Sequence, residues 1–599
     1  MTHADGTPVA LDELTDIHQE QILYDGTIES AFSTADGARV EVTTSCLPQQ
    51  DAMLYRIKTS LLCDGRAKVS IRLPYPTGKH ADDAADWTKP ERHTSRIVSQ
   101  TSHGALIAHT LDSTTYYITL QWEGEASLSE TEPHHFTLSA KNDVLTLKAT
   151  YTQKASETEP AIFVYEQDLK AVIKAWNRWW AEGAIVDFSR CTDPRAAELE
   201  RRVVLSQYLT QINCANDTPP QETGLTYNSW FGRPHLEMTW WHAVHFALWD
   251  RHDKLEKMLE WYNDVAYPKA KEIARRQGFK GIRWMKMTDP WAGEAPSNTG
   301  SFLIWQQPHY IYMAEEMYRA NPCAETLGRY AQQVEETAEF MADFVILDAA
   351  TRTYHIKGAT AMQESMSKDF SCDHPFELAY WRYGLSVAQT WRERQGLPRN
   401  KEWDDIIAHL APLPECDGIY TAGTPLHPFT SAASDTAFDP FKTPEQKGAS
   451  SISQEAFEQK SRSDHPAVLG ACALIPATMA CHSLGQMQKT FDLVRQNWNW
   501  DTTWGWDYGM SAMAAARLER QNDAIDMLLT DKKKNRYLVS GHNFQTADRL
   551  RLYLPGNGAL LTAIAMMCTG WDGCPSVPNP GFPQDGTWNV RWEGLHRMQ

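Results

Sequence analysis

Several features that define common functional classes are absent from this 599-residue chain. No stretch approaches the ~18 consecutive apolar residues of a membrane-spanning helix. The opening residues, MTHADGTPVALDEL, have neither the basic nor the apolar region of a secretory signal peptide. No two cysteines are spaced as CxxC, so a structural zinc site is not predicted. We therefore expect no membrane partner, and a cytoplasmic location is favoured unless the N-terminus is truncated.

Positive charge is also scarce, with 57 Lys and Arg against 76 Asp and Glu and a net charge of −19. Phosphate backbones require concentrated Lys and Arg, so nucleic acid is excluded as a partner. GxSxG, P-loop and GxGxxG motifs are missing, and the GNG at 556–558 is too short to indicate a nucleotide site. The eleven scattered cysteines favour buried free thiols. No cofactor and no metal are expected, and a homodimer is left open.

Tryptophan, by contrast, is abundant, with 23 residues. An indole ring combines a broad apolar face with one N–H donor. Sugars present C–H faces and hydroxyl groups, so carbohydrate sites use this combination. A single tryptophan is more simply explained by core packing, but clusters of them beside carboxylates favour a sugar site.

The chain divides into a strand-rich and a helix-rich part. Residues 1–165 contain short alternating runs separated by Gly, Asp, Ser and Pro, which predict an antiparallel β-sandwich. The runs include ARVEVTTSCL, AKVSIRLPYP, TYYITLQWEG and DVLTLKATYT. Residues 166–194 change to helical periodicity and are expected to form a helical linker. This gives a multidomain α+β protein.

Residues 195–599 are predicted to form the catalytic domain and a C-terminal tail. Apolar residues recur there at i, i+3, i+4 and i+7 in ten to twelve segments joined by long aromatic-rich loops. No identical repeat is present, which excludes the common solenoids. Paired helices of this number suit an (α/α)6 toroid, in which the site lies on the loops at one end.

Most polar and aromatic residues that packing does not explain fall in segments 228–246, 278–318, 359–381 and 500–510. These residues have a simpler structural explanation as well. Glu237 would be an acid in the first turn of a helix, facing the helix dipole, and the other side chains would cap helices or anchor loops. His242 and His245 lack an acidic third ligand at zinc-protease spacing. The expected sugar-contacting residues in these segments are His235, Glu237, Trp240, Trp241, Arg283, Trp284, Trp305, Gln306, Gln307, His309, Glu377, Asp501, Trp504 and Trp506.

Two carboxylates in these loops are candidates for catalysis. Glu364 lies in a polar loop, and Asp507 lies at the start of a helix expected at 508–520. Glycoside hydrolysis uses such a pair, because a protonated acid protonates the leaving oxygen while an ionised partner activates water or attacks the sugar. Nearby indoles supply the apolar surroundings that raise the pKa of an acid.

This layout resembles the six-hairpin glycosidases, especially glycoside hydrolase family 65 and more distantly family 95. In family 65 a Trp-Asp pair before a helix binds the sugar, and HLEMTWW is similar, with Glu237 replacing the aspartate. The resemblance implies that Glu364 is the general acid, although Gln363 stands where the family often has aspartate.

The resemblance also implies that the general base lies before a late barrel helix, at Asp507 or, second, Asp501. Phosphorylases of family 65 carry a Ser/His-rich loop there, which this chain lacks. Family 95 has a base aspartate where this chain has Pro555, which argues against a fucosidase mechanism. Residues expected on later barrel loops to contact substrate are His542, Asn543 and Asn557.

The sequence therefore predicts an exo-acting, inverting glycoside hydrolase acting on an oligosaccharide or glycoconjugate. Three alternatives stay open: a phosphorylase of the same fold, a lyase or epimerase that would use Tyr, His or Arg, and a carbohydrate-binding protein without catalysis.

Overall fold

The computed structural model describes residues 1–155, 162–295, 297, 299–427, 452–547 and 550–599. The chain forms two compact units. The first contains Met1–Lys79 and Ala84–Gly183, and the second contains His80–Asp83 and Ala184–Gln599. Within the described ranges, no helix has both the length and the apolar character needed to cross a bilayer.

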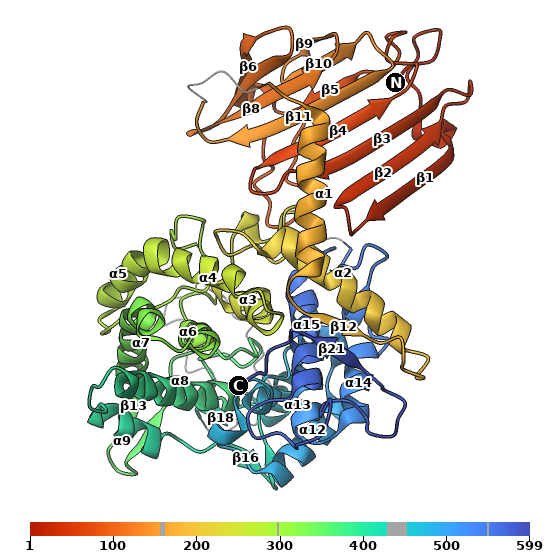
Figure 1. Ribbon diagram of the computed structural model, residues 1–599. Helices are drawn as coiled ribbons and strands as arrows, with labels where there is room; N and C mark the ends of the chain where they lie inside the picture. Colours follow the sequence, from red (N-terminus) through yellow and green to blue (C-terminus); the bar gives the residue numbers. More distant parts are fainter. Residues whose placement is uncertain (156–161, 296, 298, 428–451, 548–549) are drawn as a thin grey trace. The chain divides into compact units, whose positions relative to one another are not determined.

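The first unit is built from two antiparallel sheets (Figure 1). The larger sheet has the order β1-β2-β3-β4-β11-β8-β7-β6, and the smaller has the order β5-β10-β9. The bounds of the strands are β1 Thr15–Ile22, β2 Thr27–Ser33, β3 Arg39–Cys46, β4 Ala52–Lys58, β5 Val69–Arg72, β6 His93–Gln100, β7 Gly104–Leu111, β8 Thr114–Glu123, β9 Ala126–Glu132, β10 His135–Ala140 and β11 Val144–Thr152. The strands expected from alternating runs are thus confirmed.

Alternation along these strands produces the core of the first unit. Ile118, Leu120 and Trp122 of β8 are buried against Phe136 and Leu138 of β10. A second cluster covers the larger sheet where helix α1 (Tyr165–Ala181) packs Val172 beside Leu54. The helix expected as a linker therefore packs on this sheet and belongs to the first unit.

The second unit is helical, as expected. Its helices are α2 Ala196–Cys214, α3 Thr239–Leu248, α4 His252–Trp261, α5 Tyr267–Gln277, α6 His309–Ala320, α7 Ala324–Phe344, α8 Pro375–Arg394, α9 Lys401–His409, α10 Gln454–Ser461, α11 Gly470–Ala473, α12 Leu484–Asn497, α13 Gly505–Arg517, α14 Gln521–Leu529 and α15 Leu554–Thr569. Short two-stranded ladders join some of them: β12 Ile185–Asp187 with β21 Arg591–Glu593, β13 Ile346–Asp348 with β14 Thr353–His355, β15 Ser371–Cys372 with β18 Thr424–Pro425, β16 Glu415–Cys416 with β17 Ile419–Tyr420, and β19 Arg536–Tyr537 with β20 Asn543–Phe544.

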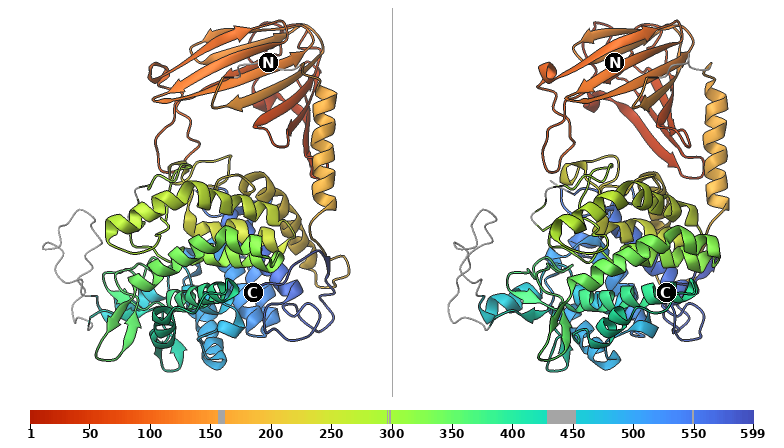
Figure 2. Two further views of the ribbon diagram at one scale, coloured as in Figure 1. Left: turned by 60° about the vertical axis from the view of Figure 1, so that its left-hand side comes forward. Right: turned by 90° about the vertical axis from the view of Figure 1, so that its left-hand side faces the viewer.

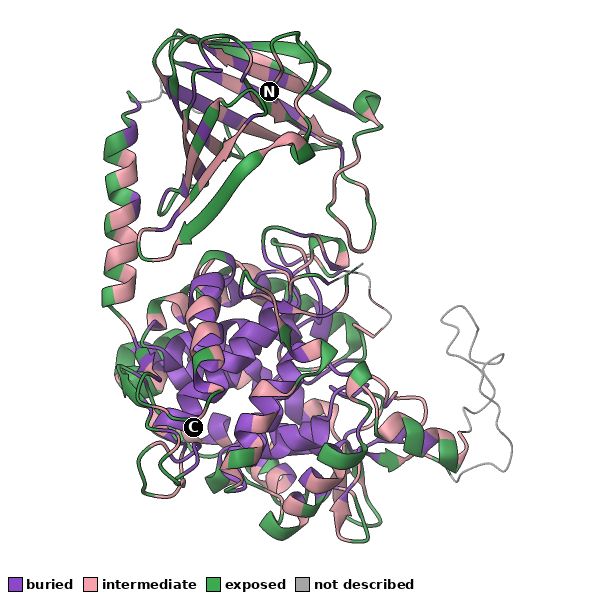
Figure 3. Ribbon diagram, turned by 90° about the vertical axis from the view of Figure 1, so that its right-hand side faces the viewer, coloured by how far each residue is buried: buried purple, intermediate pink, exposed green. Residues whose placement is uncertain are grey.

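Six helices contact one another in a closed cycle, in the order α3, α6, α8, α11, α13, α15 and back to α3. Further helices, including α4, α7 and α14, lie outside this cycle; Figure 1 labels them and Figure 2 gives two other views. The distribution of apolar residues along each helix explains which helices form the cycle and which lie outside it. Helices of the cycle such as α3 and α13 are buried all round, whereas α7 buries only the stripe containing Leu327, Tyr330 and Val334 (Figure 3).

One helix boundary differs from the expectation. Helix α13 begins at Gly505, whereas the periodicity predicted residues 508–520. Trp506 and Asp507 therefore lie inside its first turn, and the side chain of Asp507 is part of the cap of the helix.

Candidate active site

Lys286 is the centre of the first group of charged side chains in the second unit. Its ammonium lies 2.8 Å from Glu364 Oε1 and 3.4 Å from Glu237 Oε1. Thr299 Oγ1 also lies 3.2 Å from this ammonium. The side chain of Lys286 is 9% exposed and that of Glu364 is 37% exposed. Glu364 is thus the carboxylate of this group that solvent or a substrate can reach.

Glu237 and His235 extend the group inward. His235 Nδ1 lies 3.5 Å from Glu237 Oε1 and 3.6 Å from Glu222 Oε1. All three side chains are buried. Glu237 lies in a single 3-10 turn, Leu236–Met238, directly before α3. It therefore precedes the N-terminal end of the helix that the sequence predicted.

The two glutamates beside Lys286 have pKa values shifted in opposite directions. Burial raises the pKa of Glu237 and outweighs the attraction of Lys286 and His235. For Glu364 burial acts in the same direction, but the charge and hydrogen bond of Lys286 prevail and lower its pKa. Lys286 itself is buried, yet Glu364 and Glu237 raise its pKa, so it is charged.

A second group surrounds His465. Its Nδ1 lies 3.0 Å from Asp507 Oδ1, and its Nε2 lies 3.6 Å from Asp464 Oδ1. Asp507 also accepts the backbone N–H of Trp504 at 2.7 Å, which caps α13. The Asp507 side chain is fully buried, whereas that of Asp464 is 20% exposed.

Burial and charge shift the pKa values of this group as well. Burial raises the pKa of both Asp507 and Asp464. Burial disfavours the charged form of His465, but the two aspartates outweigh it and raise the pKa of His465 to about 9. His465 is therefore an imidazolium at neutral pH.

The two groups meet at Ser365. Its backbone N–H donates to Asp464 Oδ2 at 3.2 Å, directly after Glu364 in the chain. The charge of Glu364 also contributes to the raised pKa values of Asp464 and His465. Glu364 therefore lies between Lys286 on one side and the Asp464–His465 pair on the other.

Indole rings form an apolar wall beside the second group. Trp506 stacks on His465 with ring centroids 4.2 Å apart and on Trp241 at 5.2 Å. Trp305 lies 6.1 Å from Trp506. Trp504 Nε1 donates to Asp464 Oδ1 at 3.3 Å. Three of the predicted tryptophan-bearing segments thus meet at one place.

Several buried polar atoms of this region have no hydrogen-bond partner among the described residues. They include Glu222 Oε2, His235 Nε2, Glu237 Oε2 and Trp241 Nε1. Leaving a buried donor or acceptor unpaired costs about 1–3 kcal/mol, so such atoms usually face a ligand or water. Hydroxyl groups can both donate and accept, and they match this set.

Other predicted contact residues have partners within the protein. The side-chain amide of Gln307 accepts from the backbone N–H of Trp284 and donates to its carbonyl. His309 bridges Tyr380 and the carbonyl of Glu237. The remaining predicted residues are placed as follows. Arg283 donates to Gln277 and to the carbonyl of Ser301, Gln306 donates to the carbonyls of Trp284 and Leu303, and Glu377 accepts from the backbone N–H of Met362. Trp240 packs on Trp241 and Tyr312, His542 contacts Ser540, the backbone N–H of Asn543 donates to Asn557 Oδ1, and Asp501 is exposed.

Sequence reasoning missed Asp464, His465 and Glu222. The stretch SDHPAVLG at 463–470 has the ordinary composition of a turn before a helix. Only its approach to Asp507, 42 positions further along the chain, distinguishes it. The feature that could have drawn attention to it is the Asp-His pair itself, since the expected catalytic aspartate needed a partner.

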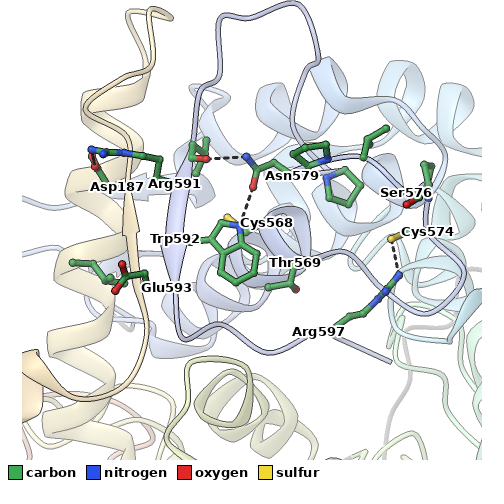
Figure 4. A pocket seen from close by; sticks show the side chains of 16 residues that line it. Asp187, Cys568, Thr569, Cys574, Ser576, Asn579, Arg591, Trp592, Glu593 and Arg597 are labelled. Atoms are coloured by element: carbon green, nitrogen blue, oxygen red, sulfur yellow. Dashed lines mark hydrogen bonds and ion pairs between the residues drawn. The ribbon is translucent and has the colours of Figure 1, made fainter.

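A surface pocket with a volume of about 1230 Å³ lies elsewhere in the second unit. Its lining contains none of the carboxylates above. Figure 4 shows Asn579 bonded to Trp592 and Arg597 directed at Cys574, and Arg591 is paired with Asp187. Because Asp187, Arg591 and Arg597 already have partners, the pocket offers less chemistry than the carboxylate groups.

No family model matches the chain, and no curated protein matches it. Among solved structures, a putative kojibiose phosphorylase from the human microbiome aligns with a TM-score of 0.65 and 11% identity, over 93% of this chain and 76% of that one. A family 78 rhamnosidase from Bacillus sp. GL1 has a TM-score of 0.41 and 9% identity, over 89% and 47%. A glycosidase variant has a TM-score of 0.42 and 10% identity, over 61% and 97%.

The likeness to the phosphorylase shows the fold. It confirms the expectation, from the resemblance to family 65, of an N-terminal antiparallel β-sheet domain followed by a helical domain.

Proposed function

We propose that the chain is a glycoside hydrolase whose reaction depends on Glu364 and on the aspartates that share His465. One observation carries the proposal: two groups of carboxylates with differently shifted pKa values meet at Ser365 beside a wall of indoles. Pairs of carboxylates in contrasting environments are typical of glycosidases.

The closed cycle of six helices supports the further proposal that the second unit is an (α/α)6 toroid. Glu364 comes from the loop before α8, Asp464 from the loop before α11 and Asp507 from the first turn of α13. Glu237 comes from the turn before α3. In this arrangement the site lies where the N-terminal ends of four of the six helices converge: α3, α8, α11 and α13. The proposed segments are a sandwich at 1–165, a helical linker at 166–194 whose helix α1 packs on the sandwich, and a catalytic domain at 195–599.

For Glu364 the proposed role is general acid. A proton donor must be protonated, whereas Lys286 lowers the pKa of Glu364. Donation therefore requires that Lys286 turn from Glu364 toward Glu237, whose carboxylate lies 3.4 Å from the same ammonium. A sugar hydroxyl that takes the place of Lys286 beside Glu364 would have this effect.

The second role, activation of water, was expected of Asp507. Its side chain is fully buried, and both of its oxygens accept hydrogen bonds. Asp464 is 20% exposed and shares the same histidine. We propose that Asp464 faces the water, and that Asp507 is a positioning residue that keeps His465 charged and oriented.

The sugar would be held by the unpaired atoms of Glu222, His235, Glu237 and Trp241, which match a polyhydroxylated ligand. We also propose exo action and inversion. Inversion requires the carboxyl groups of the acid and the base to lie roughly 6.5–9.5 Å apart across the scissile bond. The anomer of the first product, followed by NMR, separates inversion from retention.

A phosphorylase is the main alternative, since the neighbour with a TM-score of 0.65 is named as one. Phosphate binding favours cations and free helix N-termini. Here Asp507 already caps α13, and five carboxylates surround Lys286 and His465: Glu222, Glu237, Glu364, Asp464 and Asp507. Such a site repels an anion, which favours water as the acceptor.

The test is a panel of aryl glycosides and disaccharides in phosphate-free buffer. Release of free sugar that Glu364→Gln abolishes is the expected result. Turnover that begins only on adding phosphate would instead identify a phosphorylase. An unsaturated product would identify a lyase, and binding without any turnover would identify a carbohydrate-binding protein.

A further inference from the structure

Away from the proposed active site, three potential metal ligands converge at the turn between α3 and α4. They are Asp250, His252 and His596, and their ligand atoms all lie within 4.8 Å of one another. His596 Nε2 lies 2.8 Å from Asp250 Oδ1, and His252 Nδ1 lies 4.0 Å from the same oxygen. The two imidazole rings meet edge to face with centroids 4.8 Å apart.

The backbone holds these residues in place. Asp250 has φ = 57°, a left-handed conformation that turns the chain sharply after α3, and His252 is the first residue of α4. The backbone N–H of His596 donates to the carbonyl of Leu248 at 2.9 Å. Met598, two positions later, is fully buried. The three side chains can approach a metal by rotation alone, and because they are partly exposed, they have room to rotate.

The donors select the type of metal. Two imidazole nitrogens and one carboxylate oxygen favour Zn²⁺ and neighbouring transition ions, whereas Mg²⁺ and Ca²⁺ prefer oxygen ligands. Bonds of about 2.0–2.2 Å to zinc require donor atoms somewhat closer together than 4.8 Å, a movement of about an ångström. Water can fill the fourth position.

We propose that Asp250, His252 and His596 form a zinc site that fastens residues 595–598 to the α3–α4 turn. Helix α3 has ten residues, so it is about 15 Å long. The proposed zinc stands at the C-terminal end of this helix, and Glu237 stands before its N-terminal end. The metal therefore acts on stability and takes no part in the proposed chemistry.

The experiment uses the full chain, stripped with EDTA and dialysed, then titrated with ZnCl₂ by calorimetry and with CoCl₂ by absorption spectroscopy. We expect one saturable ion per chain, visible Co²⁺ bands of a low-coordinate site, and a higher thermal midpoint with Zn²⁺. Loss of a partner beyond the ligands already weakens metal sites by about 10–100-fold. His252→Ala and His596→Ala should each weaken binding by at least about 10-fold.

His409→Ala is the matched control. His409 also pairs with an aspartate, Asp405, at 3.0 Å and is similarly exposed, but among the described residues this pair belongs to no such three-residue group. The zinc affinity of the His409→Ala variant should equal that of the wild type. The proposal is overturned if the wild type shows no saturable site, if the His252 and His596 variants bind zinc as tightly as the control, or if Mg²⁺ competes equally.

Discussion

His465 and Asp507 form a buried ion pair, with Nδ1 3.0 and 3.1 Å from the two carboxylate oxygens. The pair joins the loop before α11 to the first turn of α13 and lies against the ring of Trp506. Since Asp464 adjoins the same histidine, this one contact links stability, protonation and the proposed chemistry.

The first prediction concerns pH and stability. The folded-state pKa of His465 is about 9, above its ordinary value of 6.5. Protonation therefore stabilises the fold fully below about pH 6.5, and this contribution is lost as the pH rises through about 9. The difference is on the order of 3 kcal/mol. We expect the thermal midpoint to fall between pH 6.5 and 9.

Asp507→Asn should remove most of this dependence, because it removes the largest cause that raises the pKa of His465. Thermal scans at several pH values measure the effect. His409→Gln, which alters an exposed His–Asp pair, should leave the slope unchanged. An equal fall in midpoint for Asp507→Asn and wild type would show that His465 does not titrate in this window.

The second prediction concerns Glu364. Glu364→Gln should lower kcat/KM by about 10²–10⁴-fold, the usual contribution of a general acid, with the thermal midpoint nearly unchanged. Glu294→Gln is a fitting control, because Glu294 is a glutamate that pairs with Arg276 at 2.6 Å outside the site. Wild-type turnover by Glu364→Gln would remove Glu364 from the mechanism.

The third prediction separates the two aspartates. If Asp464 faces the water, Asp464→Asn should lower kcat strongly at every pH. Asp507→Asn should lower kcat less and also shift the pH profile, since it acts through the charge of His465. Measurement of kcat from pH 4 to 10 for both variants distinguishes the roles. The reverse order of severity would restore Asp507 as the base.

The fourth prediction concerns Lys286, which lowers the pKa of Glu364. Lys286→Met should raise that pKa, so the limb of the pH–rate profile that depends on Glu364 should move to higher pH. It also leaves Glu237 buried without its cation. Loss of one partner of a buried pair costs about 3–5 kcal/mol, so the midpoint should drop. An unmoved limb would show that Glu364 does not control it.

The sequence predicts the fold well because the signals are local. Alternation marks β8 and β11, and the all-round apolar character of α13 and α15 marks buried helices. The sequence marks Glu364 as a carboxylate in a polar loop, and its catalytic role stays a prediction. The contact of Lys286 with Glu364, 78 positions apart, could not be predicted, because it depends on how the loops meet after folding.

The tryptophans also divide into those whose location the sequence predicts and those whose location it does not. Trp506 and Trp241 lie beside the charged groups, as the clusters predict. Trp122 instead fills the core of the first unit, and Trp249 donates to a backbone carbonyl of α15. Composition cannot separate these uses, since both require the same broad apolar face.

The last prediction tests the helix packing that holds the site together. Helix α15 crosses α3 at Gly558, where an added Cβ would lie 1.8 Å from the carbonyl oxygen of Trp241. Backbone cannot move aside as a side chain can, so Gly558→Ala must push the two helices apart. We expect the free energy of unfolding to fall by roughly 1–3 kcal/mol or more, and turnover to fall because Trp241 shifts.

Gly328→Ala is the matched control, since Gly328 also lies within a helix, α7, but an added Cβ there meets nothing within 4 Å. Alanine should stabilise that position by about 0.4–1 kcal/mol through the unfolded state. Denaturation of both variants gives the comparison, and equal stability of the two would contradict the close approach of α15 to α3.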